Sequence, residues 1–375
     1  MKVTLVRSRA IDPSINKIAR ALSANGSEVK LLVWDRQNTL KNCENEDYKI
    51  CRFCLRAPYD KLSALFYLPI WWLYETIFLL KDNSDIIHVC DFDTLPPAIL
   101  TKLLKNKMLF YMIYDFYSNN LPDGPANNLR KFIRFIVSSL EKSAIGLTDI
   151  LFLVDECRLE DVKGAKLKKV VYIYNSPLDC INDRSLKAPS THEVNIFYAG
   201  VIIKTRGLFD IIAAIQEIDG VKLTLAGIGP DVDKVKKLAK ISKKIDYIGL
   251  ISYDEVIKRS GDAEILFRFS DPNLSETRLA SPNKLFEAMM FGKPIIVSDC
   301  SSMANIVRKE NCGIVVPYGE IDAIKDAINR LRKGPELRNE LGRNGRAAYE
   351  HKYSWKIMEN RLISSYEEGL CNLRK

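Results

Sequence analysis

One predicted helix begins with a cation and a carboxylate that project from the same face. In the run SPNKLFEAMMFGKPIIVSD, Ser281 can cap a helix whose first position is Pro282. Lys284 falls in the first turn, and Glu287 lies three residues later on the same side of the helix. The free N–H groups of this turn and Lys284 suit a phosphate, while Glu287 could accept hydrogen bonds from a ribose diol. The same spacing also fits an ordinary ion pair on a helix surface.

A second group of cations follows a glycine turn. In NIFYAGVIIKTRGLF, a predicted strand ends before Gly200, which lets the backbone turn tightly. Lys204 and Arg206 then stand just before a helix that opens at Gly207. This arrangement favours a grip on a diphosphate, with solvated loop charges as the alternative.

A third turn lies in the run LTLAGIGPD. Gly227 and Gly229 follow another predicted strand, and Pro230 stands at the start of the next helix. A single Gly-x-Gly is weak evidence for a ligand site, because many such turns are only turns. Three glycine turns after strands of one domain, two of them beside cations, make a stronger case together.

The elements that must position these residues alternate between strand and helix along nearly the whole chain. Such alternation is typical of βαβ units around parallel sheets and predicts an α/β protein with two Rossmann-like, doubly wound domains facing a cleft. Ligands of such sheets bind outside the carboxyl ends of the strands. In the first domain we expect strands at residues 2–6, 28–33, 48–53, 86–90, 108–113, 150–153 and 170–173. In the second we expect strands at residues 194–199, 222–226, 245–248, 264–267, 294–297 and 313–316.

The boundary between the domains falls in a polar, aperiodic segment that contains prolines. This segment predicts a first domain at residues 1–175, a linker at 176–193 and a second domain at 194–351. A helix from Pro13, with Asp12 as its N-cap, exemplifies the helices expected between the strands.

Composition sets the class of protein and its compartment. The 375 residues include 47% hydrophobic and 27% charged ones, which excludes disordered, collagen-like and coiled-coil chains. A net charge of +9 suits phosphates or an acidic membrane surface, and the lack of basic runs interleaved with aromatics argues against nucleic acid. Nine cysteines and a first segment without the pattern of a signal peptide predict a reducing cytoplasm.

Residues 62–80 form the most apolar stretch, LSALFYLPIWWLYETIFLL. A membrane span needs about 20 apolar residues, whereas this run holds Pro69 and Glu75 and sits between predicted strands. Three interpretations stay open: a buried core helix, a helix whose exposed Trp-rich patch contacts a membrane or a lipid acceptor, and a true span. The residues that a membrane interface would favour are Trp71, Trp72 and Tyr74.

Over about residues 195–317 the motifs resemble the donor half of retaining glycosyltransferases of the GT-B type, the family 4-like enzymes also called glycosyl transferases group 1. The matching residues are Tyr-Ala-Gly200, Arg206-Gly, Leu-Ala-Gly227-x-Gly229-Pro, Tyr247-Ile-Gly249, Pro282-Asn-Lys-Leu-Phe-Glu287 and Gly292-Lys-Pro. Weaker matches at 85–93 and 353–355 extend the resemblance to most of the chain. It implies that residues 352–375 return to the N-terminal domain, which would bind the acceptor, while the second domain would bind the donor.

The resemblance implies a hexosyltransferase that moves a sugar from a nucleotide diphosphate donor to an acceptor hydroxyl with retention and without a cofactor or metal. The acceptor would be a sugar or a lipid-linked sugar, in the synthesis of a glycolipid, a lipid-linked oligosaccharide or a surface polysaccharide. Such an enzyme would be cytoplasmic, at the inner face of the membrane, with peripheral membrane contact through residues 62–80. A non-catalytic partner subunit of the same fold and a nucleotide-sugar epimerase are the alternatives.

Carried over residue by residue, the resemblance assigns roles to the motif residues. Glu287 would bind the donor ribose, and Arg206 stands where the family usually has the lysine that grips the diphosphate. Lys284, with Asn283 before it, would lie near the phosphates or the sugar. The residues expected to surround the nucleotide are Gly200, Lys204, Gly227, Gly229 and the loop from Gly249 to Tyr253.

Several positions depart from the family pattern. The first glutamate of the family's pair is replaced by Leu279, with Glu276 three residues earlier as a substitute. Val201 replaces the arginine that commonly follows the first glycine, which leaves Lys204 as a stand-in. The usual histidine is absent after the fifth strand, where Asp115 is the candidate catalytic residue for contacting the donor sugar or orienting the acceptor. We therefore predict Asp115, Arg206 and Lys284 as the catalytic residues.

Overall fold

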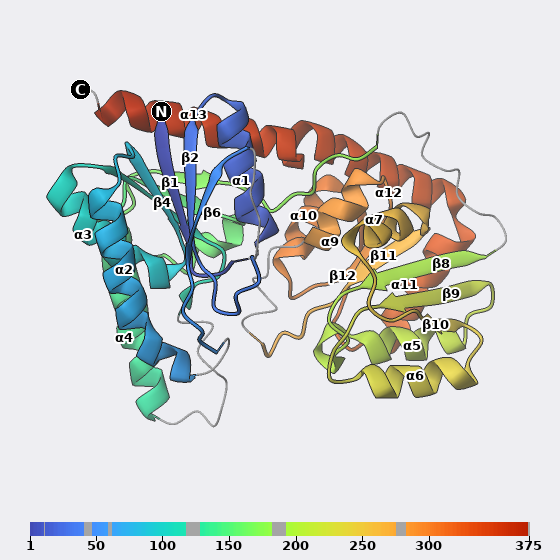
Figure 1. The fold of residues 1–375 in the computed structure, drawn as a ribbon. Coiled ribbons are helices and arrows are strands. Elements are labelled where there is room, and N and C mark those ends of the chain that lie inside the picture. Colours follow the sequence, from blue (N-terminus) through green and yellow to red (C-terminus); the bar gives the residue numbers. More distant parts are fainter. Residues whose placement is uncertain are drawn as a thin grey trace. The chain divides into compact units, whose positions relative to one another are not determined.

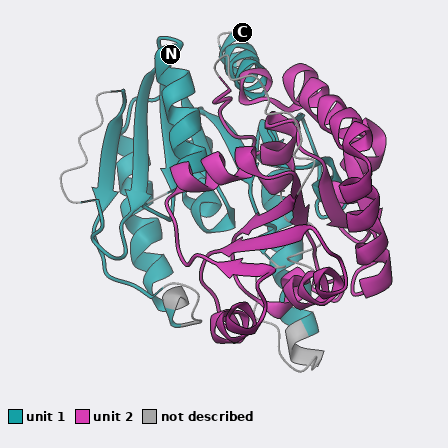
Figure 2. Cartoon of the chain, turned by 90° about the vertical axis from the view of Figure 1, so that its right-hand side faces the viewer, with its two compact units in different colours: residues 1–174, 358–375 teal, residues 175–357 magenta. Residues whose placement is uncertain are grey.

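The chain divides into two units, each with its own parallel sheet (Figures 1 and 2). The computed structural model describes residues 1–10, 12–40, 47–58, 62–117, 128–181, 193–274 and 283–373. Unit 1 comprises residues 1–174 and 358–375, and unit 2 comprises residues 175–357. The sequence had suggested a return to the first domain at residue 352; the contacts place this return within the last helix, α13 (Trp355–Leu373).

Unit 1 is built on a seven-stranded sheet in the order β3-β2-β1-β4-β5-β6-β7, with every neighbouring pair parallel. The predicted doubly wound sheet is confirmed, because the strand order reverses direction on either side of β1. The strands are β1 (Lys2–Arg7), β2 (Glu28–Trp34), β3 (Lys49–Phe53), β4 (Ile86–Cys90), β5 (Met108–Ile113), β6 (Ile150–Leu153) and β7 (Val170–Tyr172).

Three helices cover one face of this sheet: α2 (Leu68–Lys81), α3 (Leu95–Lys105) and α4 (Asn128–Ile145) (Figure 1). These helices precede β4, β5 and β6, which lie next to one another in this order in the sheet. Each helix therefore belongs to a crossover that runs in the same direction across the sheet, and right-handed crossovers in one direction place their helices on the same face. Helix α1 (Pro13–Ala24) and α13 lie on the opposite face. Asp12 caps α1 as predicted and accepts a hydrogen bond from the Ser14 N–H at 2.9 Å.

His88 on β4 belongs to the core under α13. Its Nδ1 hydrogen bonds with the Tyr366 hydroxyl, and its ring stacks on Phe152 at 5.1 Å. Burial lowers the pKa of this imidazole to about 3, so it stays neutral. His88 is therefore a packed core residue.

The apolar segment 62–80 forms a short 3₁₀ helix (Leu62–Tyr67) followed by α2. Trp71 is fully buried and stacks on Trp34 at 5.6 Å, while Trp72 donates its indole N–H to the Asp93 carbonyl at 2.8 Å. The interpretation of an exposed Trp-rich patch is wrong, because the indoles face the core. Among the described residues, no helix combines the length and the apolar composition that a membrane span requires.

Unit 2 has a six-stranded parallel sheet in the order β10-β9-β8-β11-β12-β13. Its strands are β8 (Val194–Ala199), β9 (Val221–Ala226), β10 (Ile245–Tyr247), β11 (Ile265–Arg268), β12 (Ile295–Ser298) and β13 (Gly313–Val316). The helices described between and after them are α5 (Leu208–Gln216), α6 (Val232–Ile241), α7 (Tyr253–Asp262), α9 (Asn283–Met290), α10 (Ser302–Glu310), α11 (Ile321–Lys333) and α12 (Pro335–Ala348). The order reverses at β8, which marks the topological switch point where ligands of such sheets bind.

The apolar stripe of α11 is buried except at its start. Ile324, Ile328 and Leu331 are buried in the core of unit 2, whereas Ile321 is 39% exposed. Ile321 is the first residue of the helix, and therefore it has no preceding turn of helix to cover it.

Candidate functional site

Two glycine loops meet at the carboxyl ends of β8 and β9, next to the switch point between β8 and β11. A Cβ atom on Gly227 would lie 1.8 Å from the Gly200 carbonyl oxygen, and the φ of Gly227 is +131°. A Cβ on Gly229 would lie 2.3 Å from the Ile202 carbonyl oxygen. Only glycine fits at both positions, so the two loop backbones pack directly on each other.

Backbone hydrogen bonds fix the positions of these loops. The Gly200 N–H donates to the Ala226 carbonyl at 3.0 Å, and the Gly227 N–H donates to the Gly249 carbonyl at 2.7 Å. The Tyr247 hydroxyl donates to the Gly227 carbonyl at 2.8 Å. The ends of three neighbouring strands are thereby tied into one rigid wall.

A cavity of about 340 Å³ opens against this wall, within the size range of small-molecule sites. Its sides include the backbones of the two glycine loops and the exposed apolar side chains Val201, Ile228 and Leu250. Large apolar side chains at the tips of loops are costly in water and suit the flat face of a base or a sugar ring. Its polar lining includes Lys284 from α9 and Tyr253 from the start of α7.

Lys284 and Glu287 form an ion pair at the edge of this cavity. The distance from Lys284 Nζ to Glu287 Oε2 is 2.7 Å, and the side chains are 21% and 2% exposed. An exposed surface pair, the alternative that the spacing allowed, is excluded by the burial of Glu287. Tyr253 and Lys284 line the same cavity, and burial, followed by the negative charge of Glu287, raises the pKa of the Tyr253 hydroxyl. A cation, a carboxylate and a phenol therefore gather at one point.

The predicted diphosphate cations lie on the 3₁₀ turn Lys204–Arg206, beyond the wall. The Lys204 backbone N–H donates to Asp231 Oδ2 at 2.8 Å, while the lysine side chain is exposed. The charge of Arg206 acts on the Tyr198 hydroxyl, whose pKa burial raises to about 12. Neither cation lines the cavity itself.

The remaining residues that the sequence predicts for the site do not all line this cavity. Asn283 is exposed at the first position of α9. Asp115 belongs to unit 1 and accepts a hydrogen bond from Arg158 Nη2 at 2.7 Å. The structure thus brings Gly200, Gly227, Tyr253, Lys284 and Glu287 together in unit 2. Ser281, Pro282, Glu276 and Leu279 lie outside the described residues.

A buried charge network at the carboxyl ends of β1 and β4 was not identified from the sequence. Arg7 Nε lies 2.8 Å from Asp12 Oδ2, and Arg7 also pairs with Asp91. The Asp91 backbone adopts a φ of +64°, an unusual conformation for a residue with a side chain. Strained residues of this kind concentrate at functional sites. The available signal was the position of Arg7 and Asp91 at the ends of adjacent strands.

Glu141 of α4 is a second buried group that sequence reasoning missed. Its carboxyl accepts hydrogen bonds from the Tyr111 hydroxyl at 2.8 Å and from the Tyr117 N–H at 3.1 Å. Burial raises the pKa of this carboxyl to about 8. Glu141 is therefore protonated in the folded protein at neutral pH.

Comparison with known proteins shows what unit 2 resembles. Residues 182–348, most of unit 2, match the family model described as Glycosyl transferases group 1. Unit 2 is therefore similar to the group 1 glycosyltransferases. A curated relative, the lipopolysaccharide core biosynthesis glycosyltransferase LpsD of Rhizobium meliloti, is 25% identical over 46% of this chain and 49% of its own length. The chain spans about half the length of such curated relatives.

Solved structures extend the likeness to the fold of both units. Sucrose-phosphate synthase from Thermosynechococcus elongatus superposes with a TM-score of 0.79 at 16% identity, covering 99% of each chain. The HepE protein of Anabaena, solved with UDP and glucose, gives a TM-score of 0.70 at 13% identity and covers 98% of this chain and 99% of its own. The GT-B fold expected from the sequence is confirmed.

Proposed function

We propose that this protein transfers a hexose from a nucleoside diphosphate sugar to an acceptor hydroxyl. The observation that carries the proposal is the cavity of unit 2, where the two glycine loops lie near the Lys284–Glu287 ion pair with its buried carboxylate. The glycine loops let a ligand approach the backbone closely, which a pyrophosphate needs. Glu287 offers the carboxylate oxygens that a ribose diol would hydrogen bond, and Lys284 offers the charge that a phosphate would meet.

The proposed reaction breaks the bond between the anomeric carbon and the diphosphate and forms a bond to the acceptor oxygen on the same face. Lys284 in the cavity neutralises the charge that develops on the departing diphosphate, Arg206 adds positive charge from the turn beyond the wall, and the proposed reaction therefore needs no metal. The proton of the acceptor hydroxyl passes to an oxygen of the departing diphosphate as the new bond forms. Catalysis by this chain then consists mainly of positioning and electrostatic stabilisation.

We further infer that the acceptor is a sugar or a lipid-linked sugar, and that the protein works in the cytoplasm at the inner face of the membrane. The Rhizobium relative is a glycosyltransferase of lipopolysaccharide core biosynthesis, which supports this class of acceptor. A non-catalytic partner subunit is the second candidate, because Leu279 replaces the first glutamate of the family's pair.

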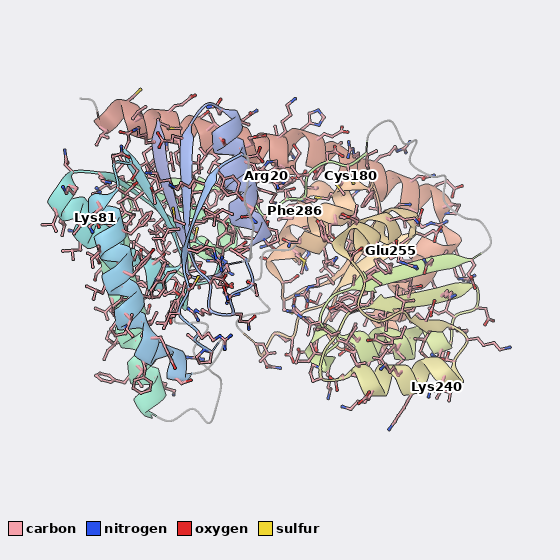
Figure 3. The ribbon with its side chains drawn as sticks, viewed as in Figure 1. Arg20, Lys81, Cys180, Lys240, Glu255 and Phe286 are labelled. Carbon is pink, nitrogen blue, oxygen red and sulfur yellow. The ribbon has the colours of Figure 1, made fainter. Side chains whose placement is uncertain are left out.

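Calorimetric titration of the purified protein with UDP-, GDP-, ADP- and dTDP-sugars tests the proposal. We expect one donor to bind, and we expect Glu287→Gln and Arg206→Ala each to weaken it about tenfold or more, since each removes a charge-assisted contact. Glu255→Gln is the matched control, because Glu255 of α7 (Figure 3) pairs with Arg259 and does not line the cavity.

Slow release of the nucleoside diphosphate from the bound donor would separate an enzyme from a partner subunit. A protein that binds none of the four donors at millimolar concentration contradicts the proposal. Binding that the Glu287 and Arg206 variants leave unchanged contradicts the placement of the donor in this cavity.

A further inference from the structure

Three arginine–aspartate ion pairs lie at the carboxyl edge of the sheet of unit 1. The pairs are Arg7–Asp91, Arg36–Asp93 and Arg158–Asp115. Their members stand at or shortly after the carboxyl ends of β1, β2, β4, β5 and β6, which are neighbours in the parallel sheet. The strand order reverses between β1 and β4, so the Arg7–Asp91 pair lies at the switch point of this sheet, where such sheets bind ligands.

In each pair the arginine side chain is less exposed than the aspartate side chain. The exposed fractions of arginine and aspartate are 6% and 20% for Arg7–Asp91, 9% and 11% for Arg36–Asp93, and 3% and 55% for Arg158–Asp115. Carboxylate oxygens therefore reach the surface along this edge, while the guanidinium groups lie behind them. A ligand that approaches the edge meets hydrogen-bond acceptors first.

Further contacts inside unit 1 occupy the three guanidinium groups. Arg7 Nε lies 2.8 Å from Asp12 Oδ2, and the Arg36 guanidinium lies 4.0 Å from the centre of the Trp34 ring. The further partners are Asp12 and Tyr114 for Arg7, Trp34 for Arg36 and Asp161 for Arg158. An anionic ligand could reach these cations only by breaking the existing pairs, which would leave largely buried aspartates without a counterion.

The loops that follow these strands carry more accessible acid than base. They comprise the described residues 8–10, 12, 35–40, 91–94, 114–117 and 154–159. The carboxylates that are exposed or half-buried in them are Asp12, Asp91, Asp93, Asp115 and Glu156. Arg9 is the exposed cation within these described residues. The edge therefore presents a negative surface to an approaching ligand.

Two half-buried aromatic rings lie among the carboxylates. Phe92 stands between Asp91 and Asp93 in the chain, and its ring centre lies 5.8 Å from that of Tyr117. The Tyr117 N–H donates to the buried Glu141 carboxyl at 3.1 Å, which fixes the backbone of this loop. Aromatic rings offer an apolar face to a sugar ring and attract the positive charge of an ammonium group.

A buried carboxyl group next to Asp93 has no partner. Glu75 of α2 is fully buried, and neither of its carboxyl oxygens has a hydrogen-bond partner among the described residues. Burial, followed by the negative charge of Asp93, raises the pKa of this carboxyl well above its usual range. Trp72, one turn before Glu75, donates its indole N–H to the Asp93 carbonyl. Unpartnered buried polar groups are rare in folded proteins, and they often mark a place where a ligand or an ordered water completes the hydrogen bonds.

We propose that this edge of unit 1 binds an acceptor sugar through its hydroxyl or ammonium groups and rejects a sugar ring that carries a carboxylate or a phosphate. Carboxylates accept hydrogen bonds and donate none, so the ring must supply the donors. A negative group on the ring meets the aspartates, while the arginines behind them are already paired. The inference rests on the proposed function, because it takes unit 1 as the acceptor unit of a transferase, and it adds the charge of the acceptor sugar.

Saturation-transfer NMR of the full chain without donor tests this selectivity. The probes are the methyl glycosides of glucose, galactose and mannose, their 2-amino analogues and their uronic acid analogues at neutral pH. We expect at least one parent or amino sugar to bind. The matching uronate should bind about tenfold more weakly or less, because its carboxylate meets Asp91 and Asp115. Tighter binding of the amino sugar than of its parent assigns the contact to an ammonium group, and equal binding assigns it to hydroxyls.

Asp115→Asn should lower the preference for the parent or amino sugar over the uronate about fivefold or more, because the amide carries no charge and also donates. Asp93→Asn is a second variant with the same expected direction. Asp47→Asn is the matched control and should leave the preference unchanged. The Asp47 side chain is 56% exposed and pairs with Arg20, but it precedes β3 and thus lies toward the amino edge of the sheet.

Uronates that bind as tightly as the parent sugars overturn the proposal, as does the absence of binding by every probe at high millimolar concentration. A preference that both the Asp115 and the Asp93 variant retain also overturns it. Donor titration with Glu287→Gln reports on the cavity of unit 2 alone. A failure of the transferase proposal is therefore distinguishable from a failure of this one.

Discussion

Substitution of Gly227 by alanine tests the close approach of the two glycine loops in unit 2. The added Cβ would stand 1.8 Å from the Gly200 carbonyl oxygen, far inside the contact distance, so one loop must move. The φ of +131° adds strain, because residues with a side chain rarely adopt it. Strain of about 1–3 kcal/mol and overpacking of about 1–3 kcal/mol give an expected loss of about 2–6 kcal/mol in the free energy of unfolding.

Gly319→Ala separates the strain from the clash. Gly319 also has a positive φ, +80°, but a Cβ there would meet nothing within 4 Å. We expect this variant to lose only about 1–2 kcal/mol, the cost of a left-handed backbone for a residue with a side chain.

Urea unfolding followed by far-ultraviolet circular dichroism measures the stability of both variants, and donor titration measures the cavity. We expect Gly227→Ala to unfold at lower urea than Gly319→Ala and to lose donor binding, while Gly319→Ala keeps it. Equal unfolding midpoints together with unchanged donor affinity in Gly227→Ala would refute the packing of the two loops as the basis of the site.

Two further predictions concern the buried charges of unit 1. Burial raises the pKa of Glu141 in the folded state from 4.5 to about 8, so the folded protein holds this proton more tightly than the unfolded chain does. The free energy of unfolding should therefore fall as the pH rises from 4.5 to about 8, by up to about 5 kcal/mol in total. Glu141→Gln mimics the neutral carboxyl, so the free energy of unfolding of this variant should not change with pH over this range. If it falls with pH as steeply as that of the wild type, another group causes the pH dependence. Asp12→Asn keeps the cap of α1 but removes the charge beside Arg7, whereas Asp12→Ala loses both, so the alanine variant should be less stable than the asparagine variant by about 1 kcal/mol in urea unfolding. Equal stability of the two Asp12 variants would show that the N-cap of α1 does not stabilise the protein.

The parts of the fold that the sequence predicted are those with a local cause. Each strand of both sheets is a short β-branched or aliphatic run bounded by turn residues, so its position could be predicted to within about two residues. The turn at Gly200 and the pair Lys284–Glu287 followed from residue type and spacing in the same way. The turn and the ion pair lie at one cavity because the sheet is parallel, which brings the carboxyl ends of neighbouring strands to the same edge.

The features that could not be predicted have their cause in tertiary packing. Helix α2 is apolar on all sides, so periodicity did not show which side faces the core. Trp71 is buried because Trp34, far away in the sequence, offers it a stacking partner. The network of Arg7 with Asp91 likewise forms only when β1 and β4 pair.

A crystal structure of the protein with its bound nucleoside diphosphate sugar tests the central claim most directly. We expect the base against Leu250, the ribose hydroxyls within hydrogen-bond distance of Glu287, and the diphosphate beside Lys284 and the Gly200 loop. A donor bound elsewhere, with this cavity empty and Glu287 paired to Lys284 alone, would contradict the account.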